Sequence, residues 1–276
     1  MKPKLIAPPG SCDTHIHIFD ERYKTVPTAV YQPPHRPTSA YLDMRNALGL
    51  ERVVVVQASV YGFDNTCLLE AMATIGSGAR GVAVVPVNVT DAELERLTAA
   101  GVRGVRFFML SGGVLPWEAL ETLARRVQPF GWHIDLQLDG RDLPHYEARL
   151  AALPVELVID HNGKFLEPVP VAHPSFRVLQ RLLDSGRCSV KLAAPYETSK
   201  VGPPLYDDVS AIARELVRTH PERCVWASNW PHPNRPENPS SAAMLDLLLH
   251  WADDDATRAK ILVDNPARIY GYPKIV

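Results

Sequence analysis

Eight short apolar or β-branched runs recur along the chain, and nearly every one is followed by a longer segment with helical spacing. The expected strands cover residues 12–19, 52–58, 81–87, 101–108, 133–138, 156–161, 189–193 and 224–229. The expected helices cover residues 38–49, 65–76, 91–100, 116–129, 141–152, 175–186, 206–219 and 241–251. Strands that alternate with helices favour a parallel sheet, and eight such units close into a (β/α)8 TIM barrel.

The size of the chain fits a single barrel domain. Its 276 residues are 46% hydrophobic and 22% charged, which is enough apolar material for one large core. No internal repeat, low-complexity block or linker divides the sequence, so we expect residues 1–276 to form one domain. Helix start signals support the assignment: Thr90 precedes the helix from residue 91, and Asn265-Pro266 precedes a last short helix.

The charge and cysteine content indicate which classes of binding partner and which cellular compartment to expect. The 29 basic and 31 acidic side chains leave a net charge of −2, which indicates no attraction to nucleic acid or to an anionic membrane. A three-residue apolar run before two prolines is too short for a signal peptide or a spanning helix, so we expect a cytoplasmic protein. Cys12, Cys67, Cys188 and Cys224 show no CxxC spacing, and we expect reduced thiols rather than disulfides or a metal site.

Polar side chains stand at the C-terminal ends of the expected strands, where a barrel interior is otherwise apolar. In strand order they are His15 and His17, Gln57 and Ser59, Arg106, Gln137 and Asp139, Asp160 and His161, Lys191, and Asn229 with His232 just beyond. Barrel enzymes place their chemistry at this end. We therefore expect these residues to converge on one cavity that binds a small molecule.

Several of these residues also have a purely structural interpretation. A single buried histidine is more often a hydrogen-bonded core residue than a ligand, but the HxH pair His15 and His17 on the first strand favours a site. Arg106 could instead form an ion pair with Asp135 or Asp160, and Lys191 could be similarly structural. The acidic run 253–255 is expected to be a solvated helix start.

Four motifs stand in order at the strand ends: DTHIH (13–17), VIDHNGKF (158–165), SVKL (189–192) and ERCVWASNWPHPN (222–234). With these motifs the chain resembles the amidohydrolase superfamily, from residue 12 to the NPARIYGY tail. More narrowly, it is similar to the branch that contains 2-pyrone-4,6-dicarboxylate lactonase and D-galactarolactone isomerase. The resemblance implies a (β/α)8 barrel enzyme that acts on a carboxylate-bearing lactone.

Asn229 separates the two activities of that branch. In the lactonase the motif W-G-[ST]-D-W-P-H supplies an Asp as general base for water, and an amide at this position cannot accept a proton at neutral pH. The isomerase has Asn there, which implies that a hydroxyl of the substrate attacks the lactone carbonyl. The segments 110–113, 161–165 and 195–199 also look like the isomerase, whereas the intact HxH pair does not, because the isomerase has lost one of these histidines.

A metal site is expected to be absent. Metal-dependent members of the superfamily use the HxH pair, a carboxylated Lys or a carboxylate on strand four, histidines on strands five and six, and an Asp on strand eight. Here strand four offers Arg106, strand five Gln137 and strand eight Asn229, and a guanidinium repels a divalent cation. We therefore expect no cofactor; the alternative is one zinc ion held by His15, His17 and His161.

The resulting hypothesis is isomerisation of a galactarolactone-like sugar-acid lactone by intramolecular acyl transfer without metal. The expected catalytic groups are His15, His17 and His161 around the carbonyl oxygen, with Asn229 and His232 around the attacking hydroxyl. The expected substrate contacts are Arg106, which clamps a carboxylate, and Gln57, Gln137, Lys191 and Tyr196. The alternatives are a metal-independent lactone hydrolase, a zinc-dependent hydrolase and a catalytically inactive binding barrel.

Overall fold

The computed structural model describes residues 2–233 and 239–274, and its eight strands form one sheet in chain order. The strands are β1 (Cys12–Ile16), β2 (Arg52–Val56), β3 (Ala79–Ala83), β4 (Val102–Phe108), β5 (His133–Gln137), β6 (Leu157–Ile159), β7 (Cys188–Leu192) and β8 (Cys224–Trp226). All neighbouring strands pair in parallel, and beyond β8 a parallel bridge joins Ile16 to Trp230. This bridge brings the first strand beside the last, which confirms the predicted (β/α)8 barrel.

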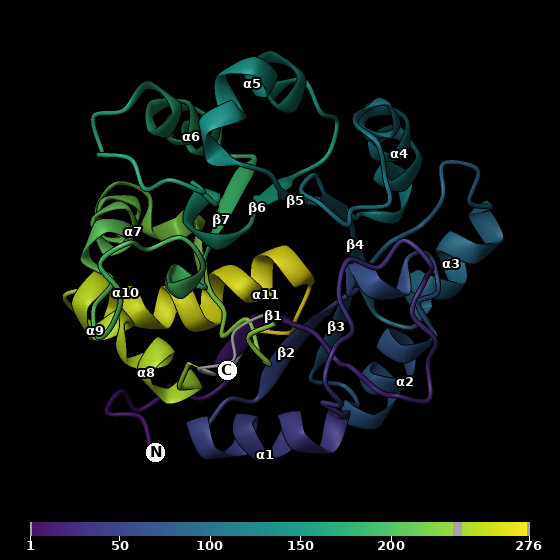
Figure 1. Ribbon diagram of the computed structural model, residues 1–276, viewed down its shortest axis with the longest axis horizontal. Helices are drawn as coiled ribbons and strands as arrows, with labels where there is room; N and C mark the ends of the chain where they lie inside the picture. The colour runs from purple at the N-terminus through teal and green to yellow at the C-terminus, as the bar shows by residue number, and fades with distance from the viewer. Residues whose placement is uncertain (1, 234–238, 275–276) are drawn as a thin grey trace.

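A ring of helices surrounds the strands (Figure 1). In order they are α1 (Thr38–Leu48), α2 (Thr66–Ile75), α3 (Asp91–Ala99), α4 (Leu120–Val127), α5 (Leu143–Ala151), α6 (Pro174–Asp184), α7 (Asp207–Thr219), α8 (Ser241–Asp246) and α9 (Leu248–Trp251). Their apolar sides face the barrel, as where α6 buries Phe176, Leu179 and Leu183. The helices and the outward side chains of the strands thus share one continuous core.

Most predicted elements are present, with shifted bounds. β3 covers Ala79–Ala83 rather than 81–87, because its pairing with β2 begins at Ala79 and Pro86 has no N–H for a ladder. The helix predicted over 241–251 divides at Leu247 into α8 and α9. Thr90 caps α3 as predicted, since its side chain accepts a hydrogen bond from the N–H of Glu93.

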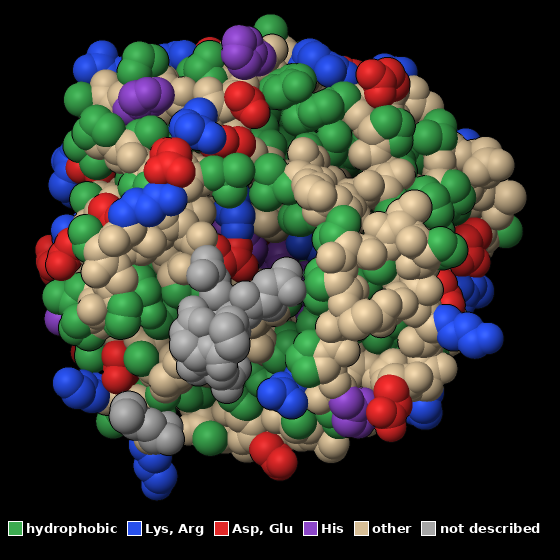
Figure 2. All heavy atoms as spheres, in the orientation of Figure 1, with side chains coloured by type: hydrophobic (Ala, Val, Ile, Leu, Met, Phe, Trp, Pro, Cys, Tyr) green, Lys and Arg blue, Asp and Glu red, His purple; other side chains and the backbone are tan. Residues whose placement is uncertain are grey.

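The N-terminal end of the barrel is closed by α11 (Asn265–Tyr270), which follows α10 (Asp255–Ala259) and a π-helical turn (Lys260–Asp264). Asn265 donates a hydrogen bond to the carbonyl of Cys224 at the start of β8, at 2.7 Å. Tyr272 donates to the carbonyl of Val53 on β2, also at 2.7 Å. The opposite end is hollowed, and Figure 2 shows basic, acidic and histidine side chains in the floor of the hollow.

Two smaller features concern the cysteines and the acidic run 253–255. All four cysteines are free and buried. In the acidic run, Asp254 caps α10 by accepting from the N–H of Thr257. No helix in the described ranges is long and apolar enough to span a bilayer.

Candidate active site

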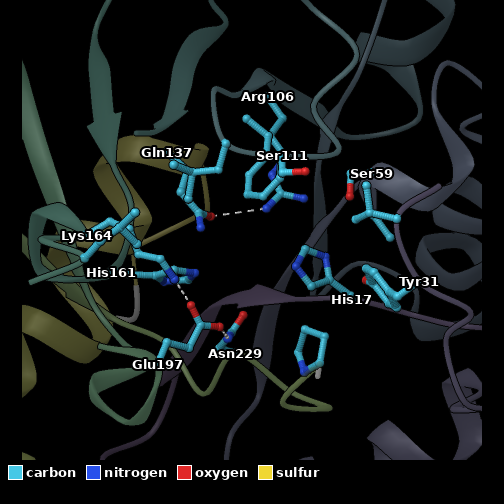
Figure 3. Close-up of a pocket in the computed structure, with 16 residues that line it drawn as sticks. His17, Tyr31, Ser59, Arg106, Ser111, Gln137, His161, Lys164, Glu197 and Asn229 are labelled. Atoms are coloured by element: carbon cyan, nitrogen blue, oxygen red, sulfur yellow. Dashed lines mark hydrogen bonds and ion pairs between the residues drawn. The ribbon is translucent and has the colours of Figure 1, made fainter. Parts of the chain in front are cut away.

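A cavity of about 360 Å³ lies at the C-terminal ends of the strands, a size that suits a small ligand. Five of the predicted site residues line it: His17, Arg106, Gln137, His161 and Asn229. Figure 3 places Arg106 and Gln137 across this cavity from Asn229. The predicted convergence of strand-end polar groups therefore holds for six residues, these five and Ser59, which come from β4 and β5 and from the segments after β1, β2, β6 and β8.

The loops that follow β6, β7 and β8 carry left-handed backbone at non-glycine residues. The φ angle is 53° at His161, 47° at Lys164, 49° at Ala194, 56° at Asn229 and 62° at His232. Each such residue costs of order 1–3 kcal/mol, and such strain gathers at functional sites. Here the tight turns set the side chains of His161 and Asn229 directly above the strand ends.

His15 on β1 and His17, just after the end of that strand, differ in depth. His17 lines the cavity, and its Nδ1 lies 2.8 Å from the carbonyl of Val56, which can only accept, so Nδ1 carries the proton. Burial and the nearby Arg106 guanidinium lower the pKa of His17 to about 3, which keeps the ring neutral. Its Nε2 therefore accepts from Nε2–H of His15, 3.2 Å away and fully buried behind it.

Beneath His15 lies a group that we call the sealed cluster: Lys191, Asp135 and Asp160, none of which is exposed. Lys191 forms ion pairs with Asp135 and with Asp160, the second at 3.0 Å, and its Nζ also lies 3.0 Å from Nδ1 of His15. Burial and the charge of Asp160 raise the pKa of Asp135 to about 7. Burial opposes ionisation of Asp160 as well, but the Lys191 ammonium beside it holds the pKa of Asp160 well below its usual range. The geometry thus supports the structural interpretation of Lys191 and gives no support to the predicted substrate contact.

Arg106 reaches the cavity from β4 with its guanidinium held at two points. Nη1 donates to the carbonyl of Gln57 at 2.7 Å, and Nη2 donates to Oε1 of Gln137 at 3.3 Å. These bonds take the place of the ion pair considered with Asp135 or Asp160. Because a guanidinium has five N–H groups, donors remain for an anion in the cavity.

Asn229 connects the cavity to a chain of hydrogen bonds behind it. Its Nδ2 donates to Oη of Tyr196 and to Oε1 of Glu197, both at 2.9 Å. The Tyr196 hydroxyl also lies 2.9 Å from Nδ1 of His232, whose Nε2 is 2.9 Å from Oγ of Ser241. Burial lowers the pKa of His232 to about 4. Within the described residues Oδ1 of Asn229 has no hydrogen-bond partner, and it points into the cavity (Figure 3).

The other predicted residues lie one layer away from the cavity. His15 and Lys191 lie below it, while Tyr196 and His232 lie behind Asn229. Gln57 is buried and its amide donates to the carbonyls of Gly62 and Asp64, at 3.1 and 2.7 Å. These five residues support the cavity wall in this geometry, and their direct roles in binding or catalysis stay predictions.

Sequence reasoning missed Lys164 and Glu197, which both line the cavity and form an ion pair. Lys164 follows a 3-10 turn (His161–Gly163) after β6, and Glu197 ends another (Pro195–Glu197) after β7. Both lie inside segments that carry the family resemblance. The available signal was a pair of opposite charges in two adjacent loops at the active end of the barrel.

Comparison with known proteins places this site in a family. The family model described as amidohydrolase matches residues 12–272. D-galactarolactone isomerase of Agrobacterium fabrum is 32% identical over 97% of this chain and 93% of the relative. The 2-pyrone-4,6-dicarboxylate hydrolase of Comamonas testosteroni is 34% identical over 98% of this chain and 92% of the relative. The chain belongs to the amidohydrolase family.

A solved structure of similar kind supports the assignment. An apo crystal structure of an Agrobacterium tumefaciens protein is 32% identical, with a TM-score of 0.94 over 99% of this chain and 100% of that one. The predicted resemblance to the amidohydrolase superfamily, and to its branch of lactone isomerases and lactone hydrolases, is confirmed. Asn234, the last residue of the motif ERCVWASNWPHPN (222–234), lies outside the described residues.

The site residues fit the metal ion of other amidohydrolases poorly. His15, Asp160 and His161 offer ligand atoms within 4.8 Å of one another, and the HxH nitrogens lie 3.2 Å apart. However, the Lys191 ammonium already contacts both His15 and Asp160, and the Arg106 charge acts on His17. Two fixed cations beside the nitrogen ligands oppose a divalent ion. The residues present therefore do not suit chemistry that depends on a bound metal ion.

Proposed function

We propose that this chain is a lactone isomerase that acts without metal on a carboxylated sugar-acid lactone, by intramolecular acyl transfer. The observation that carries the proposal is Asn229, which lines the cavity where a hydrolytic member would need a base and whose buried Oδ1 has no hydrogen-bond partner among the described residues. An amide accepts a hydrogen bond but not a proton, so this position can hold a hydroxyl and cannot activate water. Relatives named for a galactarolactone and for a pyrone dicarboxylate support a cyclic ester as substrate.

The substrate would lie across the cavity. Arg106, supported by Gln137, binds the carboxylate through its remaining N–H groups. Asn229 on the opposite wall accepts a hydrogen bond from the hydroxyl that attacks. His161 lines the cavity between them, and burial keeps its pKa well below the usual value, so a neutral ring can donate one N–H to the lactone carbonyl.

Isomerisation is favoured over hydrolysis because the attacking group is part of the bound substrate. A well-oriented intramolecular group reacts with an effective molarity of roughly 10⁵ M or more, far above that of an unactivated water molecule. Two hydrogen bonds in series join Lys191 to His15 and His15 to His17. The second one occupies the Nε2 lone pair of His17, so this ring does not activate water. The carbonyl carbon therefore reacts with the hydroxyl held by Asn229.

The Asn229→Asp variant tests the proposal. Both proteins are given sugar-acid lactones and pyrone dicarboxylates in ¹⁸O-labelled water, with and without a metal chelator. We expect the natural chain to isomerise a lactone without taking up solvent oxygen and without loss of rate in chelator, and the variant to gain hydrolysis. Asn46→Asp, an exposed change of the same charge on α1, should leave the products unchanged.

Three results would contradict the proposal. If neither protein converts any lactone, the chain is not a lactone enzyme. If the natural chain incorporates solvent oxygen, it is a hydrolase. If the chelator abolishes turnover, the reaction depends on a metal.

A further inference from the structure

Glu197 is the only carboxylate that lines the described part of the cavity. We infer that Glu197 is the proton shuttle of the isomerisation: its carboxylate takes the proton of the attacking hydroxyl and returns it to the ring oxygen that leaves. This inference rests on the proposed function and adds a catalytic residue to it.

The carboxylate is held in place from two sides. Oε1 accepts from Nδ2 of Asn229 at 2.9 Å, and Oε2 pairs with Nζ of Lys164 (Figure 3). The Glu197 side chain keeps 17% of its surface exposed at the cavity wall, against 7% for Lys164. A hydroxyl that donates into this corner meets Oδ1 of Asn229 and the carboxylate of Glu197 side by side.

The other polar groups of the cavity are poorly suited to accept this proton. Burial and neighbouring positive charge lower the pKa of His17 to about 3, and that of His161 is also held well below its usual value. The amides Asn229 and Gln137 do not accept a proton, and Arg106 is already fully protonated. Tyr31, Ser59 and Ser111 offer only weakly basic hydroxyl groups, so the carboxylate of Glu197 is the best proton acceptor in the cavity.

One carboxylate can serve both halves of the reaction. The O–H bond of the attacking hydroxyl breaks, its proton moves to Glu197, and its oxygen forms a bond to the carbonyl carbon. In the resulting tetrahedral intermediate the old ring C–O bond breaks, and its electron pair stays on the ring oxygen, which takes the proton from Glu197. No water or other reactant is consumed, and Glu197 ends as the carboxylate with which it began.

This role gives a physical reason for the amide at position 229. A carboxylate there would lie about 3 Å from Glu197, and like charges so close raise the pKa of one member strongly, so the two groups would share a proton. Asn229 instead donates to Glu197, so no second carboxylate competes with Glu197 for the proton. Lys164 acts as a positioning residue, because it fixes the second carboxylate oxygen.

The experiment compares Glu197→Gln, Glu197→Asp and Glu197→Ala with the natural chain, on a lactone that the natural chain isomerises. We expect Glu197→Gln to lower kcat by about 10²–10⁴-fold with little change in KM, and to remove the fall in kcat/KM at low pH. Formate should restore part of the activity of Glu197→Ala in proportion to its concentration, whereas a residue that only supports the wall would not be rescued. Glu197→Asp should retain intermediate activity. If Glu197→Gln does not fold, Glu197→Asp and the formate series with Glu197→Ala test the inference instead.

The matched control is Glu167→Gln, an exposed glutamate that also pairs with a lysine, Lys200, at 3.0 Å. It should leave kcat unchanged. Retention of kcat within tenfold in Glu197→Gln, or a loss confined to KM, would overturn the inference and leave the proposed function standing. A natural chain that converts no lactone would overturn both.

Discussion

Two lysine–carboxylate clusters lie at the same end of the barrel, and they differ mainly in depth. In the sealed cluster, Lys191 joins Asp135 and Asp160 with no exposed surface. In the open pair, Lys164 joins Glu197 at the cavity wall, and Glu197 keeps 17% of its side chain exposed. The same chemical groups therefore serve two purposes: buried charges hold strands together, while charges at the wall remain available to a ligand.

The largest effect is expected from Lys191→Met. The change leaves two buried carboxylates without their cation, and breaking a buried ion pair in this way costs about 3–5 kcal/mol of the free energy of unfolding. Urea denaturation measures it. Lys200→Met, which removes an exposed partner of Glu167, should cost between about 0 and 1 kcal/mol. If the two variants had equal free energies of unfolding, burial would not explain a difference in stability between the sealed cluster and an exposed ion pair.

A smaller loss of stability is expected from Lys164→Met. Glu197 faces the cavity, where water can solvate its charge, so the free energy of unfolding should fall by only about 1–2 kcal/mol. The fall in the rate of isomerisation should be easier to detect, because the Glu197 carboxylate loses one of the groups that position it. Denaturation and steady-state kinetics on the same preparation test both parts. A destabilisation as large as that of Lys191→Met, with kcat unchanged, would show that the Lys164–Glu197 pair has a structural role and not a functional one.

The smallest effect concerns His17, which lines the cavity and contacts His15. Its pKa is about 3 in the folded chain and about 6.5 when exposed, so the unfolded chain binds more protons between these values. Stability contributed by the neutral ring is therefore lost as the pH falls from 6.5 towards 3. From pH 6.5 to 5.5, His17→Gln should lose about 1 kcal/mol less stability than the natural chain. Denaturation at the two pH values measures the difference, and equal losses would show that folding does not lower the pKa of His17.

The sequence predicted the barrel because strand and helix periodicity recur eight times, and periodicity reports burial directly. It also placed Arg106, Gln137, His161 and Asn229 at the correct end, since the C-terminal ends of parallel strands share one edge. It could not rank residues by depth. Lys191 lies within β7 and is sealed, whereas Lys164 and Glu197 lie just beyond β6 and β7 and reach the cavity. That difference depends on the left-handed turns after the strands, which have no glycine signature at Lys164, Ala194 or Asn229.

The bridge between Ile16 and Trp230 has a consequence for assembly. On either side of it, the N–H of His17 donates to the carbonyl of Trp230 at 2.8 Å, and the N–H of Asn229 donates to the carbonyl of His15 at 3.1 Å. The seam that joins the first strand to the last thus runs through the centre of the candidate site. Its two sides are synthesised more than 200 residues apart, so no folding intermediate that lacks the final strand holds Asn229 beside the histidine pair. Catalytic turnover in this protein therefore also indicates that the first and last strands have paired and the barrel has closed.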